Sequence, residues 1–243
     1  MTIEKERMMK KVLPSLLFNA LILVYPITGM GAPTQNVFGV WGSLTLQGDF
    51  SFLSSDFDRI KWIVMNQSRT RDDSPKGSRF SENLLFSQVG YQMTNNASLW
   101  VGYVHNWLHP LNRSAFQENR PYEDFLWKQK FDDITFMART RLEQRINQTT
   151  GDTGHRARQF FQISHPLPIE NLSLYVGDEV FFYLNKTSFG KHGFTENRVF
   201  SGLSYNFNKM VGFDLGYMGQ YVDNATGSNL FTHNVQANLR FAF

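Results

Sequence analysis

Most of this chain consists of stretches of about ten to fifteen residues in which apolar and polar side chains alternate. The last stretch, 233–243, is the clearest, because Val235 and Leu239 share one face while Gln236 and Arg240 share the other. This period of two is typical of β-strands that have one apolar face. The chain is therefore predicted to be all-β.

The length of these stretches favours a membrane-spanning sheet. A strand in a water-soluble protein averages about 5–6 residues, whereas a tilted transmembrane strand needs about 9–11. The predicted strands are 37–48, 57–68, 80–93, 97–107, 123–131, 134–146, 155–165, 171–184, 194–207, 211–222 and 232–243. Hydrocarbon offers no hydrogen-bond partner, so every backbone N–H and C=O within it must be paired inside the protein. A sheet therefore crosses a bilayer only as a closed barrel. We therefore predict an antiparallel transmembrane β-barrel, with a soluble β-sandwich or lipocalin-like barrel as the alternative.

Short and long connections alternate along the chain, as they do in outer-membrane barrels. The segments 108–122 and 185–193 are predicted to be long outer loops. The eleven stretches are an odd number, whereas single-chain bacterial barrels have even numbers of strands. We therefore expect about 10–12 strands, with twelve preferred. Either a strand escapes the pattern, or residues 32–48 pass through the lumen before they pair.

The N-terminal segment has the layout of a secretory signal peptide. Four basic residues, the last of them Lys11, precede an apolar run that ends in a cluster of small residues. Residues 1–31 are predicted to be this signal peptide, with cleavage near residue 31 or 32, and residues 32–243 to be the barrel. The expected location is the outer membrane of a Gram-negative bacterium.

Composition narrows the classes of partner and cofactor. The chain has no Cys, which excludes a disulfide framework and a thiolate metal site. The segment 1–31 is basic, so its removal leaves a barrel that is nearly neutral, and no nucleic-acid partner is expected. The expected partners are outer-membrane lipid and, during biogenesis, the barrel-assembly machinery.

Charged side chains are predicted to gather inside the barrel if each apolar strand face points outward. Basic residues exceed acidic ones at the inward positions, most densely along 134–165. The predicted lumen cluster is Arg139, Arg141, Glu143, Arg145, Arg156, Arg158, Glu179, Arg198 and Arg240. Either these side chains pair and fill the barrel as a polar core, or the arginines line a narrow path for small anionic solutes such as phosphates or carboxylates.

Asp178 and Glu179 pose a separate question, because adjacent strand residues point to opposite faces. One carboxylate would then face lipid. A bulge at Gly177 would turn both carboxylates inward, and the alternative is that Asp178 lies near a membrane interface.

An enzymatic function has weaker support in the sequence. An outer-membrane hydrolase and a surface-loop binding or adhesion protein are the alternatives to a filled or conducting barrel. Ser164 and His165 are neighbours on opposite strand faces and cannot act together without a bulge. The His residues lack the glutamate of a helical zinc motif. No catalytic residue, metal or cofactor is predicted.

The closing strand, with Phe241 and Phe243 at alternate positions, resembles the C-terminal assembly signal of outer-membrane barrels. A wider resemblance is carried by GVWGSLTL at 39–46, SQVGYQMTNNASLWVGYVHNW at 87–107, FLWKQ at 125–129, RTRLEQR at 139–145, ISHPL at 163–167, LYVGDEVFFYLN at 174–185, ENRVFSGLSYNFN at 196–208 and GYMGQYV at 216–222. In this order they resemble an uncharacterised bacterial outer-membrane barrel family, Domain of Unknown Function 2490, over about 37–243. The resemblance implies a fold and a location, since the family has no assigned activity.

Overall fold

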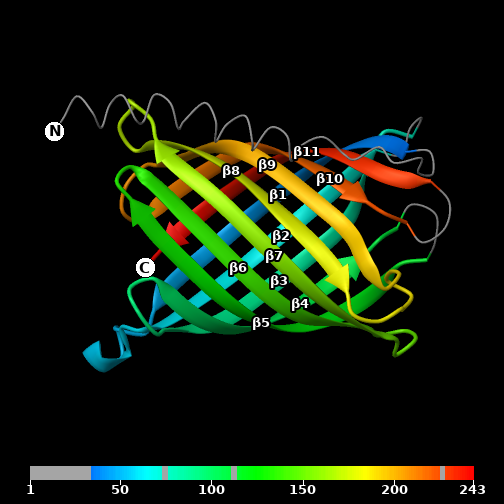
Figure 1. Ribbon diagram of the computed structural model, residues 1–243, viewed down its shortest axis with the longest axis horizontal. Helices are drawn as coiled ribbons and strands as arrows, with labels where there is room; N and C mark the ends of the chain where they lie inside the picture. The colour runs from blue at the N-terminus through cyan, green and yellow to red at the C-terminus, as the bar shows by residue number, and fades with distance from the viewer. Residues whose placement is uncertain (1–33, 73–75, 111–113, 225–227) are drawn as a thin grey trace. The chain divides into compact units, whose positions relative to one another are not determined.

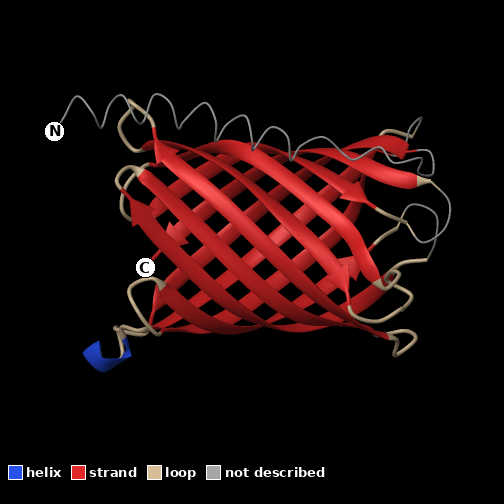
Figure 2. Cartoon of the chain, viewed as in Figure 1, coloured by secondary structure: helices blue, strands red, loops and turns tan. Residues whose placement is uncertain are grey.

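The computed structural model describes residues 34–72, 76–110, 114–224 and 228–243, and these form a closed β-barrel (Figure 1). The predicted signal peptide at 1–31 lies outside the described residues. The strands are β1 (Thr34–Asp49), β2 (Ile60–Asp72), β3 (Ser78–Gln92), β4 (Ala97–Leu108), β5 (Phe116–Phe131), β6 (Ile134–Asn147), β7 (Thr153–Pro166), β8 (Leu172–Tyr183), β9 (Gly193–Asn206), β10 (Val211–Val222) and β11 (Asn229–Ala242). One turn of 3-10 helix, Ser55–Phe57, interrupts the β1–β2 connection (Figure 2). Within the described segments, no helix is long and apolar enough to span a bilayer.

The barrel closes through a parallel pair. β1 runs beside β11 from Thr34 opposite Asn229 to Gln47 opposite Ala242, while every other neighbouring pair is antiparallel. With an odd number of alternating strands, the first and last must run in the same direction. The preference for twelve strands and a wholly antiparallel sheet was therefore wrong. β1 pairs on both sides in the wall, so no part of it threads the lumen.

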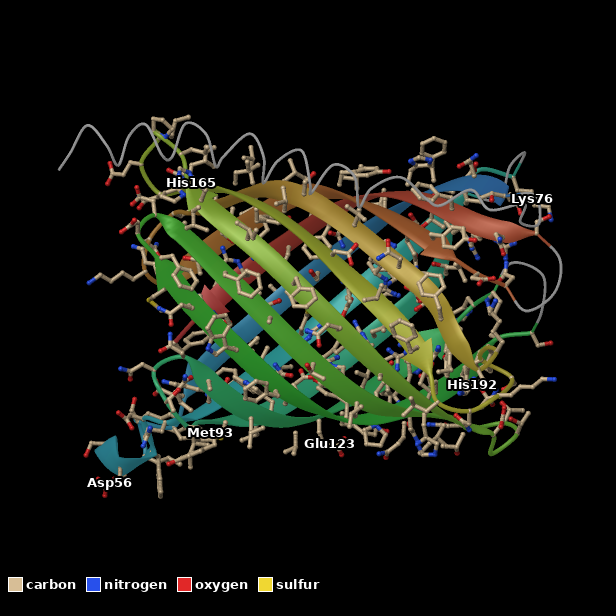
Figure 3. All side chains as sticks on the ribbon, viewed as in Figure 1. Asp56, Lys76, Met93, Glu123, His165 and His192 are labelled. Atoms are coloured by element: carbon tan, nitrogen blue, oxygen red, sulfur yellow. The ribbon has the colours of Figure 1, made fainter. Side chains whose placement is uncertain are left out.

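Connections at the two ends of the barrel differ in length. At one end they have two to five residues, apart from the longer β1–β2 connection, and at the other they have five to nine. Figure 3 places Asp56, Met93 and His165 at the first end, and Lys76 and His192 at the second. The predicted rhythm of short and long connections is thus present but weaker than expected, mainly because β5 begins inside the predicted loop 108–122.

Side chains alternate between the two sides of the wall as the sequence pattern predicts. On β4, Leu99 and Val101 point outward and are 49% and 63% exposed, while the intervening Trp100 points inward and is 9% exposed. The inner side carries a small apolar core of Leu84, Val104 and Tyr122. Polar and charged side chains also line the interior, with buried aromatic rings such as Trp41 and Phe181 among them.

Two inward aromatic rings pack over glycines of the neighbouring strand. Tyr122 covers Gly102, where a Cβ atom would come within 2.3 Å of the ring, and Trp100 covers Gly90, where it would come within 2.2 Å. The missing side chains leave the room that each ring occupies. The hydroxyl of Tyr122 also donates a hydrogen bond to Gln88 at 2.9 Å, which fixes the ring against the wall.

Filling one of these spaces should destabilise the barrel. We expect Gly102→Val to displace the Tyr122 ring and to lower the free energy of unfolding by about 1–3 kcal/mol, the usual cost of overpacking. The matched control is Gly42→Val, because a Cβ at Gly42 meets nothing within 4 Å. Urea unfolding of the barrel in detergent measures both variants. Equal midpoints would contradict the packing assigned to Tyr122.

Candidate functional site

Inward positions of adjacent strands bring charged side chains into one dense group. β6 contributes four of them at alternate positions, and Arg156 and Arg158 of β7 lie beside them. We call the following residues the lumen cluster: Arg69, Glu82, Glu118, Arg120, Asp124, Arg139, Arg141, Glu143, Arg145, Arg156, Arg158, Glu179, Glu196 and Arg198. Arginines outnumber carboxylates in it.

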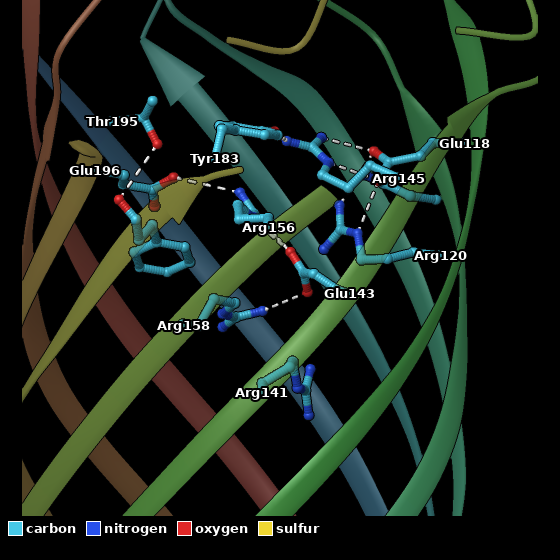
Figure 4. A network of polar contacts seen from close by, with 12 residues as sticks. Glu118, Arg120, Arg141, Glu143, Arg145, Arg156, Arg158, Tyr183, Thr195 and Glu196 are labelled. Carbon is cyan, nitrogen blue, oxygen red and sulfur yellow. Dashed lines mark hydrogen bonds and ion pairs between the residues drawn. The ribbon is translucent and has the colours of Figure 1, made fainter. Parts of the chain in front are cut away.

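Glu143 is the central acceptor (Figure 4). Its carboxylate contacts the guanidinium of Arg156 through one oxygen and accepts a hydrogen bond from Arg158 at 3.1 Å through the other. The side chain of Glu143 is fully buried, and both arginine side chains are less than one-tenth exposed. Glu143 therefore serves two cations, of which Arg158 also pairs with Glu179 and Arg156 lies 3.9 Å from Glu196.

Glu179 joins three strands in the same way. Its Oε1 accepts hydrogen bonds from Arg139 of β6 at 2.7 Å and from Arg158 of β7 at 2.8 Å. Its Oε2 lies 3.8 Å from the guanidinium of Arg198 on β9. Arg198 in turn pairs with Glu196 at 2.5 Å. The cluster is thus continuous from β6 to β9.

Further pairs lie on β5 and its neighbours. Glu118 accepts hydrogen bonds from Arg120 at 2.8 and 3.1 Å and from Arg145 at 2.7 Å, and Arg145 donates to the Tyr183 hydroxyl at 2.5 Å. Asp124 holds Arg141 in a two-pronged pair with both distances at 2.6 Å. Such forked geometry fixes the guanidinium plane as well as its position.

Aromatic rings supply the apolar surface on which the arginines stack. Phe181 of β8 is fully buried, and the guanidinium carbons of Arg156, Arg158 and Arg198 lie 4.5 to 4.9 Å from its ring centroid. Trp41 of β1 lies against Arg69 at 3.6 Å and Arg198 at 5.0 Å. The strands β1 and β9 are separated by β10 and β11 in the wall, so the Trp41–Arg198 contact crosses the interior.

The loop 184–192 lies over Arg145 at the end with the longer connections. The Phe189 ring stands 4.3 Å from the Arg145 guanidinium, and Thr187 and Gly190 form a backbone bridge beside it. Hydrogen bonding from the Ser188 side chain and from its N–H, the latter at 2.5 Å, holds the pKa of the Asp152 carboxyl in the neighbouring loop below its ordinary value. Lys191 pairs with Asp223 at 2.6 Å. These contacts tie the loop to its two neighbours.

Eight of the nine predicted lumen residues belong to this cluster. The exception is Arg240, which lies inside the barrel but contacts Asp214, Ser204 and Asn206 and shares no partner with the others. Sequence reasoning missed Glu118, Arg120 and Arg69. The outward neighbours along 116–121 are Gln117, Asn119 and Pro121, so the apolar half of the alternating pattern is absent there and the segment looked like a loop.

The proposed bulge at Gly177 does not exist. Register between β8 and both neighbours is continuous from Val176 to Val180, so Glu179 points inward and Asp178 points outward. Asp178 is only partly exposed, and it accepts a hydrogen bond from Asn197 of β9 at 2.9 Å. A neighbouring amide therefore compensates the outward carboxylate without any change of register.

The two terminal phenylalanines lie on the outward side next to the parallel pair. The N–H of Phe243 donates to the carbonyl of Gln47 at 2.9 Å, and its ring stacks on Trp62 of β2. Phe241 is opposite Val211 of β10. Their role as an assembly signal stays a prediction.

Comparisons with known proteins identify a family for this chain but no activity. Residues 38–231 match the family described as a protein of unknown function, DUF2490. An uncharacterised protein of Methylorubrum extorquens is similar at 27% identity over 166 residues, covering 67% of this chain and 73% of that protein. No solved structure matches.

Proposed function

This chain belongs to the protein family of unknown function DUF2490, and from that premise we propose that it is an outer-membrane barrel of a Gram-negative bacterium whose lumen is closed by ion pairs. The observation that carries the proposal is the burial of the lumen cluster. Glu118, Glu143 and Arg141 are all less than one-tenth exposed although they line the interior of a barrel. Such low exposure of paired charges supports an interior packed with ion pairs rather than a water-filled channel.

The outer side of the wall supports the membrane location. Large apolar side chains such as Phe38, Leu99 and Val101 are about half exposed or more on it, and soluble monomers rarely present contiguous apolar surface on this scale. The shortest strands have twelve residues, a length of about 40 Å. At the usual tilt of about 40° they reach roughly 30 Å along the barrel axis, which matches the hydrocarbon thickness.

A narrow path for small anions is the second candidate, and one feature favours it. The Nε atoms of Arg139 and Arg198 are buried and find no hydrogen-bond acceptor within the described part of the chain. Because arginines also outnumber carboxylates in the lumen cluster, an anion would meet donors there.

Planar-bilayer recording separates the two candidates. We expect the reconstituted barrel to be electrically silent, because the ion pairs and the loop 184–192 fill the lumen. Steady current with anion preference would contradict closure, and a loss of that preference in Arg139→Gln, Arg141→Gln and Arg145→Gln together would assign the path to the arginines. An unrelated open porin reconstituted in parallel confirms that insertion is being detected.

A further inference from the structure

A groove on the outer wall holds a carboxylate that the described chain does not neutralise. The groove has a volume of about 620 Å³ and crosses the strands from β2 to β6. Its apolar lining includes Val89, Leu99, Val101, Phe125 and Leu142, and Glu123 of β5 is the charged side chain that points outward among them. Figure 3 shows Glu123 on the outside of the barrel, about midway between its two ends.

Glu123 differs from the other outward carboxylate in the interior of a strand. Asp178 accepts a hydrogen bond from Asn197 at 2.9 Å. Glu123 is exposed between Val101 and Leu142, its partners on the two neighbouring strands, and no described residue donates to it. A charge at this position is costly if the wall faces lipid, so a partner from outside the chain would stabilise it.

The distribution of charged side chains on the wall limits which kinds of partner could supply a cation to Glu123. Apart from Arg79, which lies beyond the register shift between β2 and β3, each Lys and Arg of the described strands falls at an inward position of the alternation. A second copy of the barrel, apposed through the middle of its wall, therefore brings no Lys or Arg of the described strand interiors to Glu123. The volume of the groove falls in the range of small-molecule sites, and its lining of apolar side chains around one outward carboxylate is also typical of such sites.

We propose that this groove binds a cationic amphiphile, with an ammonium head against Glu123 and an apolar chain along Val89, Leu99 and Val101. An ammonium group has three donors for the carboxylate. Apolar surroundings strengthen the attraction between the two charges relative to water. The proposal concerns the outer wall only, so it stands whether the lumen is closed or conducting.

Photolabelling with matched amphiphiles tests the site. The probes are a twelve-carbon primary amine and a twelve-carbon alcohol, each with a diazirine at the end of the chain, added to the full barrel in maltoside micelles. We expect the amine to label β3 and β4 about tenfold more than the alcohol does, the usual scale of a charge-assisted hydrogen bond in a partly dry site. Glu123→Gln should lower amine labelling to the level of the alcohol.

Two further variants separate a specific pair from general surface charge. Asp178→Asn removes the other outward carboxylate and should leave the labelling unchanged. Glu123→Lys should abolish amine labelling and make the groove accept a twelve-carbon carboxylate instead. Because Glu123 has no partner in the described wall, folding of both Glu123 variants is expected and is checked by the gel shift between heated and unheated barrel.

Three results would overturn the proposal. Equal labelling by amine and alcohol would show that charge plays no part, and amine labelling that survives Glu123→Gln would place the amine elsewhere. Cross-links that join two barrels through Leu99 and Val101 would show that a second copy occupies the groove. Because silence or current in bilayers reports on the lumen, failure here is distinguishable from failure of the proposed closure.

Discussion

Glu143→Gln is expected to destabilise the folded barrel by about 3–5 kcal/mol, the cost of leaving a buried charge without its partner. Glu143 is the shared acceptor of Arg156 and Arg158. Its amide analogue keeps the shape of the side chain but withdraws the negative charge from both. Urea unfolding of the purified barrel in detergent should show a large drop in midpoint with an unchanged slope.

Two further variants serve as controls for this result. Glu170→Gln changes an exposed carboxylate in the β7–β8 turn and should leave the midpoint unchanged. Replacing Glu143, Arg156 and Arg158 together by Met removes these three charges at similar volume, and should recover much of the loss, since buried ion pairs are often replaceable by apolar side chains and Glu179 keeps Arg139. If Glu143→Gln has the same urea midpoint as the Glu170→Gln control, the lumen cluster is hydrated and does not hold the barrel together.

A disulfide across the parallel pair is expected to give the largest gain in stability. Ser43 of β1 and Asn238 of β11 are opposite each other, and the Ser43 hydroxyl donates to the Asn238 side chain at 2.9 Å. The two positions are 195 residues apart in the chain. In the chain-entropy model, cysteines at these positions should stabilise the oxidised barrel by about 5 kcal/mol, less any strain in the bond.

The same pair tests the number of strands. Because the natural chain has no Cys, the only thiols are the two introduced ones. Ser43→Cys with Asn238→Cys should cross-link readily on oxidation, whereas Ser43→Cys with Gln220→Cys, on β10, should not. A twelfth strand between β1 and β11 would separate the first pair. Failure of that pair to cross-link in folded barrel would contradict closure by eleven strands.

The alternating pattern predicts the direction of side chains well, because burial on one face imposes a period of two on each strand. Arg139, Arg141, Glu143 and Arg145, which it predicts to point inward, take part in ion pairs of the lumen cluster. The pattern missed the part of β5 before Glu123, where the outward residues Gln117 and Asn119 are also polar. The signal for a strand is a contrast between two faces, so it vanishes wherever both faces are polar.

The alternating pattern of a single strand does not indicate which distant strand it pairs with. The preference for twelve strands came from the even count of antiparallel barrels, whereas β1 and β11 pair in parallel. The surroundings of Asp178 were likewise not predictable from its own strand. Its compensation by Asn197 depends on the register between β8 and β9, which an isolated strand does not reveal. The groove around Glu123 likewise needs five strands side by side before it exists.

Depth-resolved labelling of β4 tests most directly whether the outward face of this barrel meets lipid. Single cysteines at Leu99, Val101 and Tyr103, which point outward, and at Ser98 and Val104, which point inward, would carry a fluorophore in barrel reconstituted into vesicles. We expect lipids brominated on the acyl chain to quench the three outward labels strongly and the two inward labels weakly. Equal quenching of both sets by a water-soluble quencher, with none from the lipid, would contradict a membrane-spanning barrel.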